Sequence, residues 1–167
     1  MNRKTFLVSL FNAALFTVLI LFHYSGASIK IMNANPISAL ALLVALIMFT
    51  SELGGVLTGV TVGIVIDSVA ATPNGFNTVT LTLISFGAAI ASHYLLNRNI
   101  KAAVTLCLIC AALYFAARWL VTFAFAGDIA GSLTYLIRYA APSAVYTTVF
   151  VIPFFYIERQ LFSKLNK

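Results

Sequence analysis

Charged residues are scarce in this chain. Only 8% of its 167 residues are Asp, Glu, Lys or Arg, whereas 62% are hydrophobic. Soluble domains carry about 25% charged and about 45–50% apolar residues, so these few charges are not enough to cover a surface that faces water. The composition excludes a soluble domain. It predicts an integral membrane protein, because apolar runs close to the roughly 20 residues that cross a bilayer recur along the chain.

Side chains that carry chemistry are equally sparse. The chain has 4 acidic residues and 2 histidines, and no HExxH, GxSxG, P-loop or GxGxxG motif occurs. Cys107 and Cys110 have the C-x-x-C spacing, but they lie in the apolar stretch TLCLICAAL, with no His or second Cys pair nearby to complete a zinc site. We therefore expect neither an enzyme nor a metal or cofactor site.

The net charge of +6 follows from residues at the ends of apolar segments. A nucleic-acid-binding surface needs a basic patch interleaved with aromatic residues, and no such patch is present. The basic residues are better explained by membrane topology.

Six transmembrane helices in a single domain over residues 1–167 fit the apolar runs best. The predicted helices are 5–23, 37–50, 53–69, 78–96, 102–125 and 142–158. The last of these begins at Pro142, because a proline at the first helical position loses no hydrogen bond. Residues 37–69 can be read as one helix, which gives five crossings, or as two short helices, which give six. One helix would be roughly 50 Å long, which is too long for a single span.

The distribution of basic residues decides between five and six crossings. Five crossings would place the basic residues near position 100 opposite those at the N-terminus, against the tendency of basic loops to face the cytoplasm. Six crossings place both termini in the cytoplasm, and the fold class is then an all-α polytopic membrane protein. Four basic residues are expected to make cytoplasmic contacts: Arg98, Lys101, Arg159 and Lys164.

The third predicted helix carries a ridge of glycines in the sequence GGVLTGVTVGIVIDSV. Gly55, Gly59, Gly63 and Asp67 follow one another at intervals of four, so they share one helix face. Lipid is as apolar as a leucine side chain, and close packing over small residues therefore holds membrane helices together. Two interpretations are open: the ridge packs against the second or fourth helix of this chain, or it binds a transmembrane helix of another protein.

Asp67 is a carboxylate in an otherwise apolar helix, where charge is costly and is usually paired or functional. It lies roughly 21 Å from the start of its helix, at a depth similar to that of Arg118 in the fifth helix. We predict an ion pair between Asp67 and Arg118. The alternative is that Asp67 reaches the outer interface and is solvated there.

The residues after Asp67 predict a turn into the fourth helix. Thr72-Pro73-Asn74-Gly75 fits a type I turn, with Pro at the second position and Gly at the fourth. Asn77 or Thr78 is then a suitable N-cap residue for the helix that follows.

The stretch from Gly54 to Leu96 resembles the MreD family of rod shape-determining membrane proteins, in which a glycine-spaced helix runs into Asp and is followed by a Gly-containing segment and a Leu-rich helix. The residues that carry the resemblance are Gly55, Gly59, Gly63, Asp67, Gly75 and Leu81. The C-terminal APSAVYTTVFVIPFFYIERQLF is similar to the last helix of that family, with Pro142, Ser143 and Tyr146. Arg118 and the C-x-x-C pair are not features of the family and gain no support from it.

The resemblance implies a non-catalytic scaffold of the cell-elongation complex in the bacterial cytoplasmic membrane, active in peptidoglycan synthesis and cell shape. Its implied partners are MreC, a single-span coiled-coil protein, and, directly or indirectly, MreB, RodA and a class B penicillin-binding protein. Membrane lipid is a further expected partner, and nucleic acid is not.

A second function class comes from the similarity in fold between MreD-like proteins and the substrate-binding S components of energy-coupling-factor vitamin transporters. Ser9 and Ala13 have the small-residue spacing with which such proteins contact their membrane partner. A vitamin pocket would need polar or aromatic groups near the outer face. Candidates are Lys30, Asn33, Asn35, Trp119, Asp128 and Tyr135.

Overall fold

The protein is a bundle of helices. The computed structural model describes residues 3–24, 37–70, 75–124 and 134–165, with side chains described for 8–23, 37–69, 75–123 and 134–163. All regular elements within these ranges are helical, which confirms the predicted all-α class. They are α1 (Arg3–Tyr24), α2 (Ser38–Ile47), α3 (Glu52–Ala70), α4 (Phe76–Ile90), the π-helical η1 (Ala91–Leu95), α5 (Ile100–Ala124), the π-helical η2 (Leu136–Ala140) and α7 (Ala141–Leu165).

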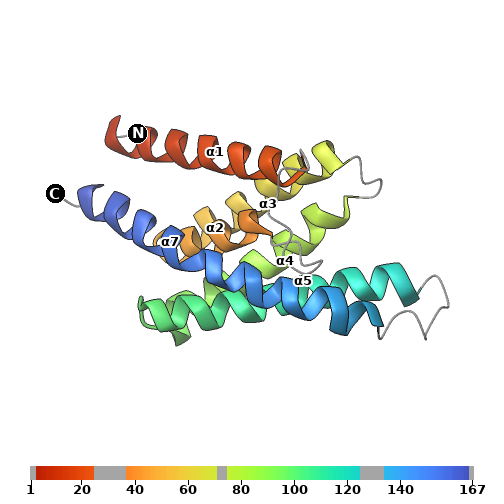
Figure 1. Ribbon diagram of the computed structural model, residues 1–167. Coiled ribbons are helices and arrows are strands. Elements are labelled where there is room, and N and C mark those ends of the chain that lie inside the picture. Colours follow the sequence, from red (N-terminus) through yellow and green to blue (C-terminus); the bar gives the residue numbers. More distant parts are fainter. Residues whose placement is uncertain (1–2, 25–36, 71–74, 125–133, 166–167) are drawn as a thin grey trace.

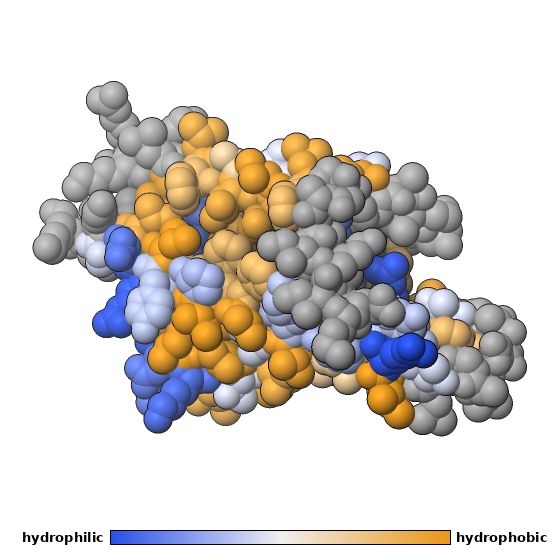
Figure 2. Space-filling model, in the orientation of Figure 1, coloured by the Kyte–Doolittle hydropathy of each residue, from blue (hydrophilic) through white to orange (hydrophobic). Residues whose placement is uncertain are grey.

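The helices run roughly along one direction, and the two ends of the chain lie at the same end of the bundle (Figure 1). Figure 2 shows one face of the protein in the same orientation, with hydrophobic residues across its middle and hydrophilic residues toward its two ends. This is the distribution of a protein whose middle lies in hydrocarbon and whose ends meet water.

Within the described ranges, four helical segments are long and apolar enough to cross a membrane: Glu52–Val69, Phe76–Leu95, Ile100–Phe123 and Leu136–Ser163. They identify the chain as a membrane protein. Two further apolar helices, Val8–His23 and Ser38–Ile47, are shorter. The six-span topology and the cytoplasmic location of both termini stay predictions.

α2 is enclosed by the other helices. All ten of its residues are buried, and a helix that is apolar on every side is expected in such a position. Predicted at 37–50, it ends at Ile47. Ten residues extend about 15 Å, half of the roughly 30 Å hydrocarbon core, so α2 is too short to cross a bilayer alone.

The start of α2 lies inside the protein, where its free backbone N–H groups need partners. The Ile37 N–H donates to Thr147 Oγ1 of α7 over 3.0 Å. The Thr147 hydroxyl donates in turn to the Ser143 carbonyl over 2.8 Å, and Thr147 is fully buried. A single threonine of α7 therefore anchors the buried end of the central helix.

α3 packs most extensively against α4, and the glycine ridge makes this contact possible. A Cβ atom on Gly59 would clash with the Ser85 side chain, and one on Gly63 would lie 2.5 Å from Thr78 Cα. A Cβ on Gly55 would lie 3.1 Å from Ile47 Cγ1 of α2 and 3.7 Å from Ala89 Cβ of α4. Of the two roles predicted for the ridge, packing within the chain is the one these contacts describe.

The last helix begins earlier than predicted. Leu136–Ala140 is π-helical and continues directly into α7, so Pro142 lies within a helical run and not at its first position. A proline inside a helix lacks its N–H and crowds the preceding turn. The wider π turn just before Pro142, closed by the Ala141 N–H on the Leu136 carbonyl, accommodates this.

Adding one methyl group to the ridge should destabilise the protein. We expect Gly63→Ala to lower the free energy of unfolding by about 1–3 kcal/mol, because the new Cβ would press on the α4 backbone. Gly87→Ala is the matched control, since nothing lies within 4 Å of a Cβ there. Thermal unfolding in detergent micelles compares the two, and equal stability of both variants would contradict the packing account.

Candidate functional site

Asp67 caps the start of α4. Its two carboxylate oxygens accept hydrogen bonds from the backbone N–H groups of Asn77 over 3.1 Å and Thr78 over 2.8 Å. They also accept bonds from Asn77 Nδ2 over 2.8 Å and Thr78 Oγ1 over 2.6 Å. The free N–H groups at a helix start carry partial positive charge, so a carboxylate is well placed there. Asp67 thus joins the end of α3 to the beginning of α4.

Gly75 gives the chain the sharp turn that this cap requires. It has a φ of +60°, in the left-handed region that glycine enters without strain, and it immediately precedes α4. Asn77 and Thr78 were predicted as N-cap residues, but they contribute donors to Asp67. The capping acceptor comes from the preceding helix, and residues 71–74 of the predicted turn lie outside the described ranges.

Asn77 extends the network to α5. Its side chain is buried, and its Oδ1 accepts a hydrogen bond from the Tyr114 hydroxyl over 2.6 Å. A continuous hydrogen-bonded path therefore runs from Asp67 through Asn77 to Tyr114 and links α3, α4 and α5. The two ends of the Asn77 amide are both used, which fixes its orientation.

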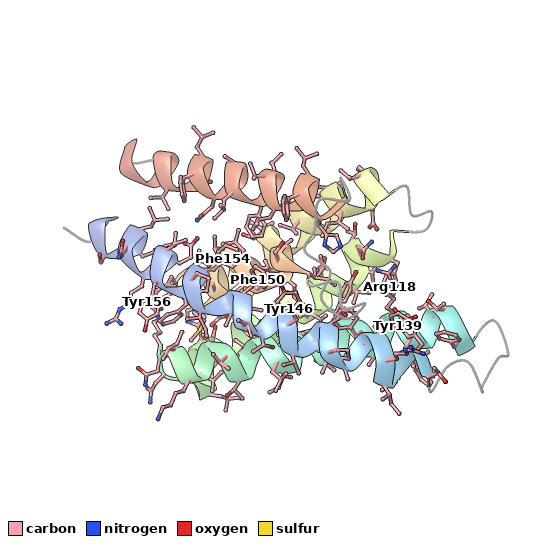
Figure 3. The ribbon with its side chains drawn as sticks, viewed as in Figure 1. Arg118, Tyr139, Tyr146, Phe150, Phe154 and Tyr156 are labelled. Atoms are coloured by element: carbon pink, nitrogen blue, oxygen red, sulfur yellow. The ribbon has the colours of Figure 1, made fainter. Side chains whose placement is uncertain are left out.

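Arg118 lies one helical turn beyond Tyr114 on α5, with an exposed side chain. The described hydrogen bonds of Asp67 come from α4, and the predicted ion pair between Asp67 and Arg118 stays a prediction. Figure 3 shows Arg118 and Tyr139 near the end of the bundle that lies opposite the chain termini.

A cavity of about 180 Å³ lies beside this network. Its wall includes Tyr114, Arg118 and a stacked pair of tyrosines, Tyr135 and Tyr139, whose ring centroids are 5.7 Å apart. The remaining described lining residues are Ile20, His23, Ile37, Ala39, Ile66, Phe115 and Ser143. Guanidinium and hydroxyl donors on apolar and aromatic walls suit a small ligand with an anionic or acceptor-rich group.

The residues predicted for a vitamin pocket are only partly brought together. Tyr135 lines the cavity, whereas Trp119 of α5 is not among its described lining residues. Lys30, Asn33, Asn35 and Asp128 lie outside the described residues. Tyr114 and Tyr139 also line the cavity but were not predicted to do so, although a tyrosine within an apolar helix is visible in the sequence.

The residues predicted to contact the cytoplasm lie near helix ends. Arg98 and Lys101 are exposed around the start of α5, and Arg159 is exposed on α7. The side chain of Lys164 lies outside the described part. The η1–α5 connection and the chain termini share one end of the bundle (Figure 1), which is the arrangement that a common cytoplasmic surface would need.

A second polar pair was not predicted. Asn12 of α1 donates from Nδ2 to Glu158 Oε2 of α7 over 3.3 Å, and the two side chains are only 6% and 0% exposed. Asn12 Oδ1 and Glu158 Oε1 have no hydrogen-bond partner among the described residues. An asparagine in the middle of an apolar helix was the available signal, but its partner is 146 residues away in the sequence.

Asn12 also lines a groove of about 490 Å³ between α1 and α3. Ser9 and Ala13, singled out in the sequence for their spacing, lie on the same wall. A second groove of about 600 Å³ lies between α4 and α5 and is lined mostly by aliphatic residues and by Gly87, Ala88 and Ala91.

Cys107 and Cys110 are free and buried in α5. Among the residues that the structure describes, no group of three or more His, Cys, Asp or Glu side chains is placed to hold a metal ion.

Comparison with models of protein families, with curated proteins and with solved structures finds no match to this chain.

The Asp67 network should be a major source of stability. We expect Asp67→Asn to lower the free energy of unfolding by about 2–4 kcal/mol, because a carboxylate that accepts charge-assisted bonds is replaced by a weaker acceptor with one oxygen. Tyr114→Phe should cost about 1 kcal/mol, since one neutral hydrogen bond is lost.

Chemical or thermal unfolding in micelles measures both changes. Ser68→Ala is the control, because Ser68 is exposed next to Asp67 and its described hydrogen bond, over 2.8 Å, goes to the Ile64 carbonyl of its own helix. A loss for Ser68→Ala as large as that for Asp67→Asn would contradict the network.

The predicted ion pair has a distinct signature. If Asp67 and Arg118 interact, Asp67→Asn and Arg118→Gln together should lower the melting temperature no more than the worse single variant does. Strictly additive losses in this double-mutant cycle would show that Arg118 acts independently of Asp67.

Proposed function

We propose that this protein is a non-catalytic membrane scaffold of the bacterial cell-elongation machinery, similar to MreD. In this role it binds an MreC-like single-span protein in the cytoplasmic membrane and, through it, is connected to MreB, RodA and a class B penicillin-binding protein. Its activity is to hold these partners in place during peptidoglycan synthesis.

The observation that carries the proposal is that the residues behind the MreD resemblance are structural. Gly59 and Gly63 bring α3 against α4, and Asp67 with Gly75 fixes the turn between these helices. Packing and capping residues are what a rigid scaffold needs. A reaction centre needs converging acids, bases and nucleophiles instead.

Two lateral grooves give such a scaffold places for partners. They lie between α1 and α3 and between α4 and α5, and membrane helices associate through close packing over small residues of the kind that both grooves contain. The glycine ridge, used inside the chain, does not provide this surface.

One observation favours a different class, the substrate-binding S component of an energy-coupling-factor transporter. The cavity beside Tyr114, Arg118 and Tyr139 lies near the end of the bundle opposite the chain termini, where a substrate-binding protein would take up a ligand from outside. Its size of about 180 Å³ suits only a small ligand or part of a larger one.

The two proposals are separated by affinity purification of a tagged chain from native membranes in mild detergent, followed by mass spectrometry. We expect an MreC-like coiled-coil protein, accompanied by MreB, RodA or a penicillin-binding protein, at least tenfold enriched over a tagged membrane protein of similar size. Recovery of a pair of ATPases with a membrane coupling subunit, in place of these partners, would overturn the scaffold proposal and establish the transporter class.

A further inference from the structure

The groove between α1 and α3 has the length and the lining residues of a binding groove for a helix. On α1 it is lined by Ser9, Ala13, Thr17 and Ile20, and on α3 by Gly54, Thr58, Thr61 and Val65. Each set recurs at intervals of three or four residues and extends about 16 Å, or three helical turns. In Figure 1 both helices run from the end of the bundle with the chain termini toward the opposite end. Small and hydroxyl-bearing residues of both helices line the groove.

Four threonine hydroxyl groups in this groove can only accept further hydrogen bonds, because their protons are already donated within the chain. Thr17, Thr58 and Thr61 donate to backbone carbonyls of their own helices over 2.9, 2.7 and 3.0 Å. Thr50, at the same groove, donates to the Leu46 carbonyl over 3.0 Å. Each of these four protons is used and each oxygen keeps a lone pair, so the four threonines favour an occupant that brings donors.

The buried pair behind this wall has the same requirement. Asn12 lines the groove and binds Glu158, yet Asn12 Oδ1 and Glu158 Oε1 receive no hydrogen bond from the described residues. Glu158 is fully buried and forms no ion pair within the described part of the chain. A buried carboxylate in a membrane helix is costly unless a cation or donor accompanies it.

We propose that the groove between α1 and α3 binds a membrane-spanning helix of a partner protein, and that a lysine or arginine on that helix donates to Asn12 Oδ1 and offsets the charge of Glu158. The inference rests on the proposed scaffold function and names the surface and the chemistry of its partner.

Charge complementarity selects a helix with a basic residue over a lipid chain. An acyl chain brings neither a donor nor a positive charge. Asn12 lies about 14 Å along α1 from Arg3, so a lipid amine at the membrane surface is poorly placed to reach it. A basic side chain on a helix seated along three turns of the groove can approach at the depth of Asn12, while its stem packs against Ala13 and Phe16.

The test places a photo-crosslinking amino acid at Ala13 or Thr61 in the full chain, expressed in its native membrane. Phe86 of α4 and Val149 of α7 are the control positions, because both are 55% exposed and neither lines a described groove or cavity. We expect both groove positions to crosslink to one membrane-spanning segment that contains Lys or Arg, and the control positions to give no such product. Adducts with phospholipid alone would overturn the proposal.

Dependence on the buried pair is tested in the same assay. Glu158→Gln keeps the side-chain shape, and Asn12→Leu removes the acceptor; each should reduce the crosslinked product at least tenfold. Undiminished crosslinking in both would overturn the role of the pair. Gel filtration in detergent checks that each variant stays folded. If one variant does not fold, the crosslinks formed by the chain without Glu158→Gln or Asn12→Leu still test the groove.

The outcome also separates this inference from the proposed function. If an MreC-like protein co-purifies but crosslinks only from Phe86 or Val149, the groove assignment is wrong and the scaffold proposal stands. If another protein with a basic residue in its spanning helix crosslinks from the groove and depends on Glu158, the groove assignment stands and the MreD-like function is wrong.

Discussion

The close approach of α3 to α4 is the constraint on which the rest of the structure depends. In hydrocarbon no hydrophobic effect drives two helices together, so their association relies on packing distance and on polar contacts. Gly59 and Gly63 remove the Cβ atoms that would keep the helices apart, and Asp67 supplies hydrogen bonds at the end of the pair. Because Asn77 passes this network on to Tyr114, the position of α5 depends on the same contact.

The polar groups of the interior fall into two kinds. The Asp67 network is satisfied, because both carboxylate oxygens accept hydrogen bonds, Asn77 Nδ2 donates one and Asn77 Oδ1 accepts one, and such networks make a structure rigid. The Asn12–Glu158 pair keeps two acceptor atoms without a donor among the described residues. This contrast is the physical reason to assign stability to the first site and partner binding to the second.

Local features of the sequence predicted much of the fold. Apolar runs predicted the six helices to within a few residues at most ends, and the spacing of Gly55, Gly59 and Gly63 predicted a packing face. The short length of α2 was harder to predict, because periodicity alone does not tell a spanning helix from one enclosed on every side. Its buried start depends on Thr147, which is 110 residues away.

The candidate sites were predicted less well, because they too depend on contacts between residues of different helices. Asp67 was recognised as significant, yet the role that the structure describes for it depends on the backbone N–H groups of a neighbouring helix, which no sequence pattern displays. Glu158 is the last residue of the sixth predicted helix, and only the three-dimensional fold places it behind Asn12 with no exposed surface.

The measurement that tests the central claim most directly is the affinity of an MreC-like partner for a ridge variant, determined together with the stability of that variant. If the ridge builds the fold and the partner binds elsewhere, Gly59→Ala will lower the melting temperature, while the fraction that remains folded binds the partner with unchanged affinity. Unchanged stability with partner binding lost would mean that the ridge is the docking surface, and would contradict the account.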